Sequence, residues 1–116
     1  MTPAFDPAAC AQRQLDAYNA RDLTRFVAEY TDDVEVYRLP GTAPILQGKQ
    51  QLAAHYRENR FNLPDLHAKL VNRMVVGNKV IDQEYVTGLA GHPMEVAAIY
   101  EVTPQGISKV WFVSAN

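Results

Sequence analysis

The chain has 116 residues, of which 21% are charged and 47% hydrophobic, and its formal net charge is −2. This composition is typical of a globular protein, and we expect residues 1–116 to form a single domain. The scattered basic residues form no stripe, which argues against nucleic-acid binding. Cys10 is the only cysteine, which excludes an intramolecular disulfide and a multi-cysteine zinc site.

The sequence shows no membrane span, no signal peptide and no cluster of metal-binding residues. No apolar run approaches the ~18 residues of a membrane span, so we expect no membrane partner. The start of the chain lacks the basic flank and apolar core of a signal peptide, and we expect a cytoplasmic protein. The three histidines, His55, His67 and His92, are dispersed rather than clustered at ligand spacing. We therefore expect no metal and no cofactor.

The first half of the chain predicts helices. Asp6-Pro7 is a helix start, and apolar residues at helical spacing continue it to about Asn19. Asp22 caps a second, shorter helix, and Gly48 opens a third helix that ends at Asn62-Leu63-Pro64-Asp65.

Extended segments separate these helices and fill the second half. Thr31-Asp32-Asp33 predicts a turn, the alternation over residues 34–38 predicts a strand, and Ile45-Leu46 is a short extended piece. Gly77-Asn78 predicts a hairpin. Four further strands are expected over Leu66 to Val76, Lys79 to Thr87, Met94 to Thr103 and Ile107 to Val113. The pattern predicts an α+β fold in which a curved antiparallel sheet wraps around three helices and leaves a concave interior.

Two segments carry a resemblance to a known superfamily. They are Ala17-Tyr18-Asn19-Ala20-Arg21-Asp22-Leu23 and Tyr30-Thr31-Asp32-Asp33-Val34-Glu35-Val36. Together with Gly48 and the last hairpin, they resemble the nuclear transport factor 2-like superfamily, in its SnoaL-like and ketosteroid isomerase-like branch. The resemblance covers nearly the whole chain and implies a cone-shaped, cystatin-like roll. The superfamily holds isomerases, cyclases, epoxide hydrolases and binding modules, so the fold does not fix an activity.

The ketosteroid isomerase branch can be compared residue by residue. The resemblance places Arg38 at the position of the catalytic base, Gln14 at that of the helical tyrosine and Tyr100 at that of the protonated acid. The supporting tyrosine is retained as Tyr56. Arginine cannot abstract a proton at neutral pH, which argues against the steroid isomerase mechanism. Arg38, Tyr100, Tyr56 and Gln14 are the candidate catalytic residues.

The same resemblance sets which strand residues face the interior. We expect a largely apolar pocket whose further lining includes Tyr18, Val36, Asn72, Met74, Tyr85 and Trp111. Leu66, Ala68, Leu70, Ala98 and Val113 are also expected to face inward.

Arg38 is the most distinctive of these residues. Facing inward, it would bind a carboxylate, an enolate or another anion. Alternatively, it forms a structural salt bridge to Asp82, Glu84 or Glu101, or reaches water at the rim.

Asp82 and Glu84 are the acids nearest to a general base, and the expected strand orientation puts both on the outer face. A shift of the hairpin by one residue would turn them inward.

Three functions are compatible with these residues. The first is a cofactor-independent isomerase-, cyclase- or lyase-type enzyme acting on a hydrophobic carbonyl-containing or anionic small molecule. The second is a binding module that holds such a ligand in the same cavity without chemistry, and the third is a protein-interaction module with a filled cavity. A carboxylate open to the cavity near Arg38 would favour the enzyme.

The outer face of the sheet predicts self-association. We expect Tyr37, Val71, Val75 and Ile99 to form an apolar patch there, with Glu35, Lys69, Arg73 and Glu101 as its polar rim. The expected partner is a second copy of the chain in a homodimer.

Overall fold

The computed structural model describes residues 5–115. The expectation about a signal peptide falls partly on residues 1–4, which lie outside the described residues. In chain order the elements are α1 (Pro7–Asn19), α2 (Leu23–Ala28), β1 (Tyr30–Arg38), β2 (Leu46–Gln47), α3 (Gly48–Asn59), β3 (His67–Val76), β4 (Lys79–Thr87), β5 (Met94–Thr103) and β6 (Gly106–Ser114). Within the described part, none of the helices has the length and apolar character needed to cross a membrane.

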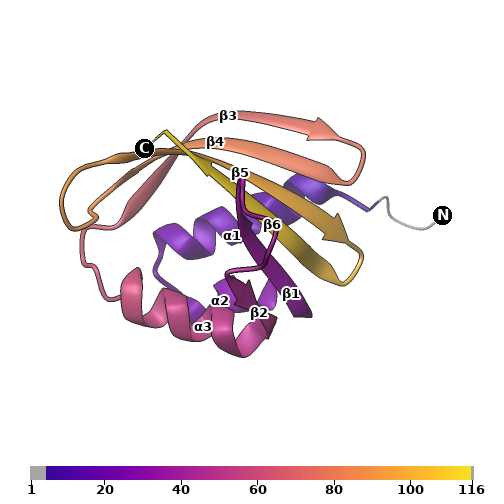
Figure 1. Cartoon of the computed structure of the whole chain (residues 1–116), viewed down its shortest axis with the longest axis horizontal. Coiled ribbons are helices and arrows are strands. Elements are labelled where there is room, and N and C mark those ends of the chain that lie inside the picture. Colours follow the sequence, from indigo (N-terminus) through magenta and orange to yellow (C-terminus); the bar gives the residue numbers. More distant parts are fainter. Residues whose placement is uncertain (1–4, 116) are drawn as a thin grey trace.

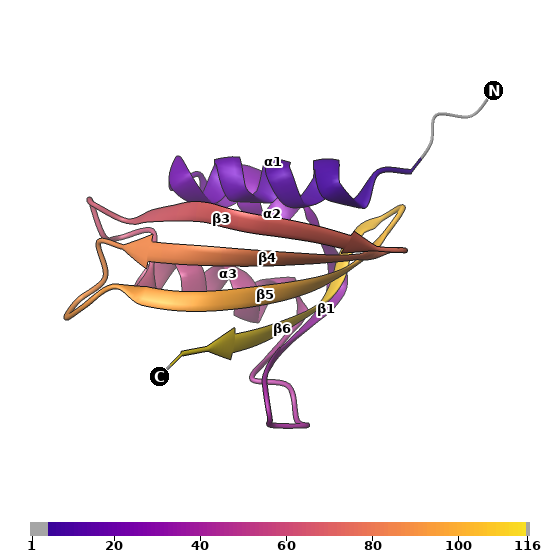
Figure 2. The same ribbon diagram turned by 90° about the horizontal axis from the view of Figure 1, so that it is seen from above.

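The strands form one sheet in the order β2-β1-β6-β5-β4-β3. Neighbouring strands run antiparallel, except for β1 and β6, which run parallel to each other. Figure 1 shows the three helices on one side of the sheet, which bends over them. Seen from above, α1 runs along the β3 side of the sheet (Figure 2). The predicted α+β class with a curved sheet around three helices is confirmed.

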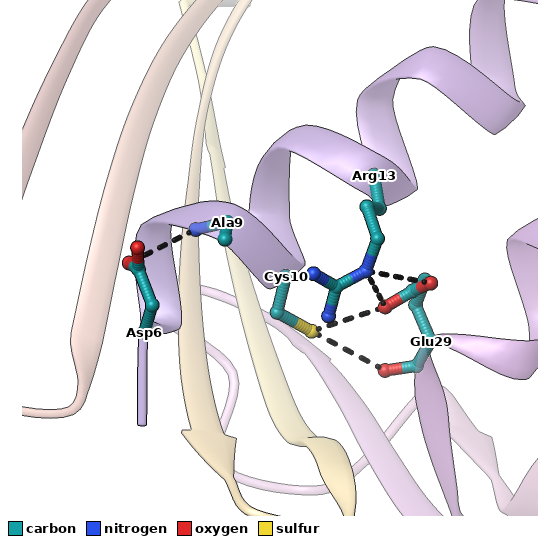
Figure 3. Close-up of polar contacts among 5 residues, drawn as sticks. All are labelled: Asp6, Ala9, Cys10, Arg13 and Glu29. Carbon is teal, nitrogen blue, oxygen red and sulfur yellow. Dashed lines mark hydrogen bonds and ion pairs between the residues drawn. The ribbon is translucent and has the colours of Figure 1, made fainter. Parts of the chain in front are cut away.

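Local signals in the sequence set the helix starts. The Asp6 carboxylate accepts a hydrogen bond from the Ala9 N–H at 3.1 Å, ahead of Pro7 in the first turn of α1 (Figure 3). Asp22 caps α2 in the same way, through the Arg25 N–H at 3.1 Å. One expectation is wrong: Thr31-Asp32-Asp33 is no turn but part of β1, which begins at Tyr30 and pairs irregularly with β6 between Tyr30 and Glu35.

Figure 3 also shows how α1 is tied to the segment after α2. The Cys10 Sγ lies 3.5 Å from Glu29 Oε1, and Arg13 Nε donates to both carboxylate oxygens of Glu29 at 3.1 and 3.2 Å. Burial, aided by Glu29, raises the pKa of the Cys10 thiol to about 11. The thiol therefore stays protonated, and Cys10 is the small buried residue that the sequence predicts.

Asn19, the last residue of α1, fixes the helix to the sheet. Its side-chain Nδ2 donates to the Ala68 carbonyl at 3.0 Å, and its Oδ1 accepts from the Ala68 N–H at 2.8 Å. Ala68 lies on β3, which is the last strand on that side of the sheet. The two bonds hold α1 against the concave face.

An extra residue in β3 changes which side chains face the helices. Leu70 pairs with Glu84 but Asn72 pairs with Gln83, so Val71 is inserted as a β-bulge. Before the bulge Leu66 and Ala68 are buried, as predicted. After it the alternation is shifted by one residue. Asn72 and Met74 therefore lie on the outer face, and their predicted inward orientation is wrong.

The same shift moves two residues of the predicted outer patch. Arg73 turns inward and contacts Asp82, so it is not a rim residue. Val75 pairs directly opposite the buried Val80 and lies on the helix side of the sheet, although it is 48% exposed beyond the helices.

A second bulge has the same effect in β6. Glu101 pairs with Lys109 and Val102 with Ile107, which leaves Ser108 as the extra residue. Ile107 and Val110 are both buried as a result. Trp111 and Val113 therefore face outward rather than inward. The Trp111 ring stacks on Tyr37 with a centroid distance of 5.9 Å and an interplanar angle of 15°.

The register of β4 overturns one further expectation. Val80 pairs with Tyr100, Asp82 with Ala98 and Glu84 with Val96. Since Ala98 and Tyr100 are buried on the inner face, as predicted, Asp82 and Glu84 share that face. Tyr85 consequently points outward and is 43% exposed. The predicted orientation of β4 is wrong, and the alternative that turns both acids inward is correct.

Candidate functional site

A cavity of about 100 Å³ lies between the helices and the inner face of the sheet. Exposed residues at one end, among them Arg38 and Ile45, form its mouth. Most of its wall is apolar or aromatic. The lining residues are Gln14, Leu15, Tyr18, Val36, Arg38, Ile45, Leu46, His55, Tyr56, Arg60, Glu84, Val86, Met94, Val96, Tyr100, Phe112 and Ser114.

The structure brings together all four candidate catalytic residues and part of the predicted lining. Arg38, Tyr100, Tyr56, Gln14, Tyr18 and Val36 line this cavity. The other four predicted lining residues do not reach it, because the bulges and the register of β4 place them on the outer face: Asn72, Met74, Tyr85 and Trp111.

Glu84 is the acidic residue of the cavity wall. Its side chain is buried, at 7% exposure, and it forms no hydrogen bond or ion pair with any other described residue. Burial raises the pKa of Glu84 to about 7, with a further increase from the neighbouring Asp82 and a decrease from Arg73. Near neutral pH this carboxyl group therefore exists in both protonation states.

Asp82, two residues earlier on the same face, is fully paired. Arg73 Nε and Nη2 donate to its two carboxylate oxygens at 2.7 and 2.9 Å, and Arg73 Nη1 donates to Gln12 Oε1 at 2.9 Å. Asp82 is completely buried. A bidentate guanidinium is the partner that such a buried carboxylate requires. This group is not available to a ligand.

Buried tyrosines supply hydroxyl groups to the cavity. Burial raises the pKa of Tyr56 and of Tyr100 above the ordinary tyrosine value, and it raises the pKa of Tyr18 to about 12. The electrostatic effect of Glu84 acts in the same direction on each of them. All three phenols therefore stay protonated near neutral pH and can donate hydrogen bonds to an oxygen atom in the cavity.

Gln14 joins the cavity to the core beneath it. Its Nε2 donates to the Tyr30 hydroxyl at 3.1 Å, while its buried Oε1 has no hydrogen-bond partner among the described residues. An unpaired buried acceptor is uncommon in folded proteins. Gln14 therefore adds an unpaired acceptor to a wall that also contains the Glu84 carboxyl group.

The mouth of the cavity is positively charged. Arg38 is exposed at the rim and forms none of the three salt bridges considered from the sequence. Asp82 pairs with Arg73, Glu101 pairs with Lys79, and Glu84 pairs with no residue in the described part of the chain. Arg60 and His55 lie beside it. Partial burial and the charges of Arg60 and Arg38 lower the pKa of His55, which is therefore neutral at neutral pH.

The sequence does not identify three titratable residues of this site, Glu84, Arg60 and His55. The expected strand orientation puts Glu84 on the outer face, although Val80 and Val86 at even spacing around it are a signal for the inner face. Arg60 and His55 belong to the site only because the end of α3 packs over the sheet, which no local pattern shows. Among the residues described, no group of three or more His, Cys, Asp or Glu side chains could hold a metal ion.

The fold is a cone-shaped α+β domain with an internal cavity, and comparisons with known proteins agree with this fold. Residues 11–110 match the model of the SnoaL-like domain, so the chain belongs to the SnoaL-like family. The SnoaL-like family predicted from the sequence motifs is therefore confirmed, and solved structures described as nuclear transport factor 2-like share the fold. A comparison with curated proteins gives no match.

Solved structures with the same fold come from several bacteria. An uncharacterised cystatin-fold protein from Novosphingobium aromaticivorans is 28% identical, with a TM-score of 0.79 and coverage of 94% of this chain and 98% of that one. A SnoaL-like protein of unknown function from Burkholderia thailandensis is 24% identical, with a TM-score of 0.80 and coverage of 100% and 99%. A candidate ketosteroid isomerase from Kribbella flavida is 22% identical, with a TM-score of 0.80 and coverage of 95% and 78%.

Proposed function

We propose that this SnoaL-like protein is a cofactor-independent enzyme that moves a proton on a small, largely apolar carbonyl compound. One observation carries the proposal: the cavity wall contains a buried carboxyl group, Glu84, that no described residue pairs. Burying a carboxylate without a partner is unfavourable for folding. Such a group is typical of a site whose partner is the substrate.

The cavity contains the groups that one enolisation step requires. The Glu84 carboxylate takes a proton from the carbon next to the carbonyl, and the C–H electron pair becomes a carbon–carbon double bond. The carbonyl oxygen takes the negative charge and accepts hydrogen bonds from Tyr56 and Tyr100. Protonated Glu84 then returns the proton to the same carbon, which exchanges it, or, where the substrate carries a β,γ-double bond, to the γ-carbon of the dienolate, which completes an isomerisation.

The protonation state of Glu84 suits this task. A pKa of about 7 is near the operating pH, which is the most effective value for a group that accepts and then returns a proton. The base differs in place from that of the ketosteroid isomerases, whose position is taken here by Arg38. The family includes isomerases and cyclases, which is consistent with chemistry of this kind.

Proton exchange in D₂O tests the proposal directly. The protein is incubated with cyclohexanone and with methyl levulinate, and the loss of α-proton signal is followed by NMR. We expect exchange above the buffer rate, rising with an apparent pKa of about 7. Glu84→Gln should reduce it about 10²–10⁴-fold, the usual contribution of a positioned acid–base group.

Glu95→Gln is the matched control, because Glu95 is exposed on the outer face of β5 and lines no part of the cavity. It should exchange protons at the wild-type rate. If the wild type binds these ketones without exchanging them faster than buffer, the protein is the non-catalytic binding module instead, and the proposal is wrong.

A further inference from the structure

Two arginines stand together at the mouth of the cavity without acidic partners. Arg38 is the last residue of β1, and Arg60 directly follows α3. Neither forms an ion pair with a described carboxylate. Arg73, on the inner face of the sheet, is in contrast paired with Asp82. Arg60 Nη1 donates to the carbonyl of the adjacent Asn59 at 2.8 Å, and the guanidinium group also lies within hydrogen-bonding reach of the Tyr18 hydroxyl. Most of the donors of both guanidinium groups are therefore left for another molecule.

The guanidinium groups of Arg38 and Arg60 both lie close enough to His55 to affect its pKa. Both lower the pKa of His55, which lies on α3 at the cavity wall. Bringing like charges together is unfavourable unless an anion joins them. Since His55 is neutral, it adds a hydrogen-bonding ring nitrogen without a third positive charge.

The charge of the cavity changes sign from the mouth to the interior. Arg60 lowers the pKa of Tyr18 while Glu84 raises it, so this one hydroxyl group is within electrostatic reach of both. The wall around them is apolar, and the cavity itself is only about 100 Å³. These features suit a small molecule with an anionic end at the mouth and an uncharged end inside.

We propose that the substrates are small keto acids, whose carboxylate binds Arg38 and Arg60 while the carbonyl end enters the cavity toward Glu84. This inference rests on the proposed function for the role of the carbonyl group, but the anion subsite stands by itself. A carboxylate matches the planar donor pattern of guanidinium groups and can accept two parallel hydrogen bonds from one of them. A phosphate ester also carries negative charge, but the narrow apolar interior favours the carboxylate with its short carbon chain.

Binding of levulinate and of its methyl ester, measured by calorimetry at one fixed ionic strength, tests the anion subsite. The two molecules share a ketone, and only levulinate carries a charge. We expect wild type to bind levulinate at least tenfold more tightly than the ester. Arg38→Met and Arg60→Met should each remove most of this preference and leave binding of the ester unchanged. Arg57→Met is the matched control, because Arg57 also lies at the end of α3 but is paired with Glu58 and lines no part of the cavity.

The Glu84→Gln variant separates this inference from the proposed function. It should bind levulinate at least as tightly as wild type, because a negative charge is removed from the cavity, yet fail to exchange the α-protons of levulinate. Exchange at the wild-type rate would contradict the proposed function and leave the anion subsite standing. Equal affinity for levulinate and its ester, an unchanged preference in both arginine variants, or no binding of levulinate to wild type would overturn the inference.

Discussion

Asp82 and Glu84 differ by one methylene group and lie two residues apart on the same face of β4, but their surroundings are opposite. Asp82 is completely buried and is held by two hydrogen bonds from Arg73. Glu84 is buried nearly as deeply, has no such partner and lines the cavity. The difference lies on the neighbouring strand, where the bulge at Val71 turns Arg73 toward one acid only.

The comparison separates a structural charge from a reactive one. A paired buried carboxylate is held in place by its hydrogen bonds to the guanidinium group and links two neighbouring strands. An unpaired one moves its pKa toward neutrality and becomes able to exchange a proton. Burial alone therefore does not identify a catalytic acid; its hydrogen-bond partners do.

Removing Arg73 should have the largest effect on stability, because Asp82 would then be a buried acid without a partner, as Glu84 is. Arg73→Met leaves a fully buried carboxylate without its partner, and we expect a loss of about 3–5 kcal/mol in the free energy of unfolding. Urea denaturation at pH 7 measures it. Since Arg73 lowers the pKa of Glu84, the pH profile of proton exchange should also move upward.

Two control variants test whether this loss of stability comes from the unpaired buried charge. Arg73→Met combined with Asp82→Val should recover most of the loss, because both charges are then replaced by apolar groups. Lys79→Met, which breaks the exposed pair with Glu101, should cost less than about 1 kcal/mol. A loss no larger in Arg73→Met than in Lys79→Met would show that the pair is not the structural charge described here.

Glu84→Gln should reveal a pH-dependent contribution to stability. The pKa of Glu84 is about 7 in the folded protein against 4.5 in the reference state, so the folded protein holds this proton more tightly. Its stabilising effect is complete below pH 4.5 and is lost as the pH rises to 7. The free energy of unfolding of Glu84→Gln relative to wild type should therefore increase by about 3 kcal/mol between pH 4.5 and pH 8. Denaturation curves across this range measure the change, and a difference that does not vary with pH would contradict the raised pKa.

The two faces of the sheet provide a further comparison. Large apolar side chains remain exposed on the outer face, among them Met74 (51%), Tyr85 (43%) and Val113 (42%). We propose that a second copy covers this patch, at roughly 800 Å² per partner. Light scattering at ~100 μM should give twice the 13.0 kDa of one chain for wild type, and the single mass for Met74→Asp combined with Val113→Asp. A monomeric wild type would contradict the homodimer.

Trp111 should show the smallest effect, because it packs against Tyr37 rather than lining the cavity. Trp111→Ala should lower the free energy of unfolding through the lost ring stack, which contributes about 0.5–1.5 kcal/mol beyond the buried area. Its affinity for levulinate should equal that of wild type, as measured by calorimetry. Weaker levulinate binding in this variant, with the fold intact, would show that Trp111 contributes to the pocket.

The elements and the fold class could be predicted from the sequence because their signals are local. Asp6-Pro7, Asp22 and Gly77-Asn78 each act through neighbouring backbone groups. The faces of β3 and β6 could not be predicted, because one inserted residue reverses every later side chain and neither bulge has a distinctive local sequence.

Part of the candidate site could also be predicted from the sequence. Arg38, Tyr56, Tyr100 and Gln14 reach the cavity from elements whose orientation the resemblance fixes correctly. Two acids in a strand normally indicate a solvated face. Asp82 is buried only because Arg73 arrives from another strand, and such a partner cannot be found from the composition of β4 alone.

The two hydrogen bonds between Asn19 and Ala68 also bear on aggregation. An edge strand such as β3 presents free backbone groups that can recruit a strand from another molecule. The Asn19 amide supplies one donor and one acceptor to the Ala68 backbone, as a neighbouring strand would, and so occupies that position. α1 therefore protects this position of the edge strand from pairing with another molecule, while the outer face of the sheet stays open for the homodimer proposed above.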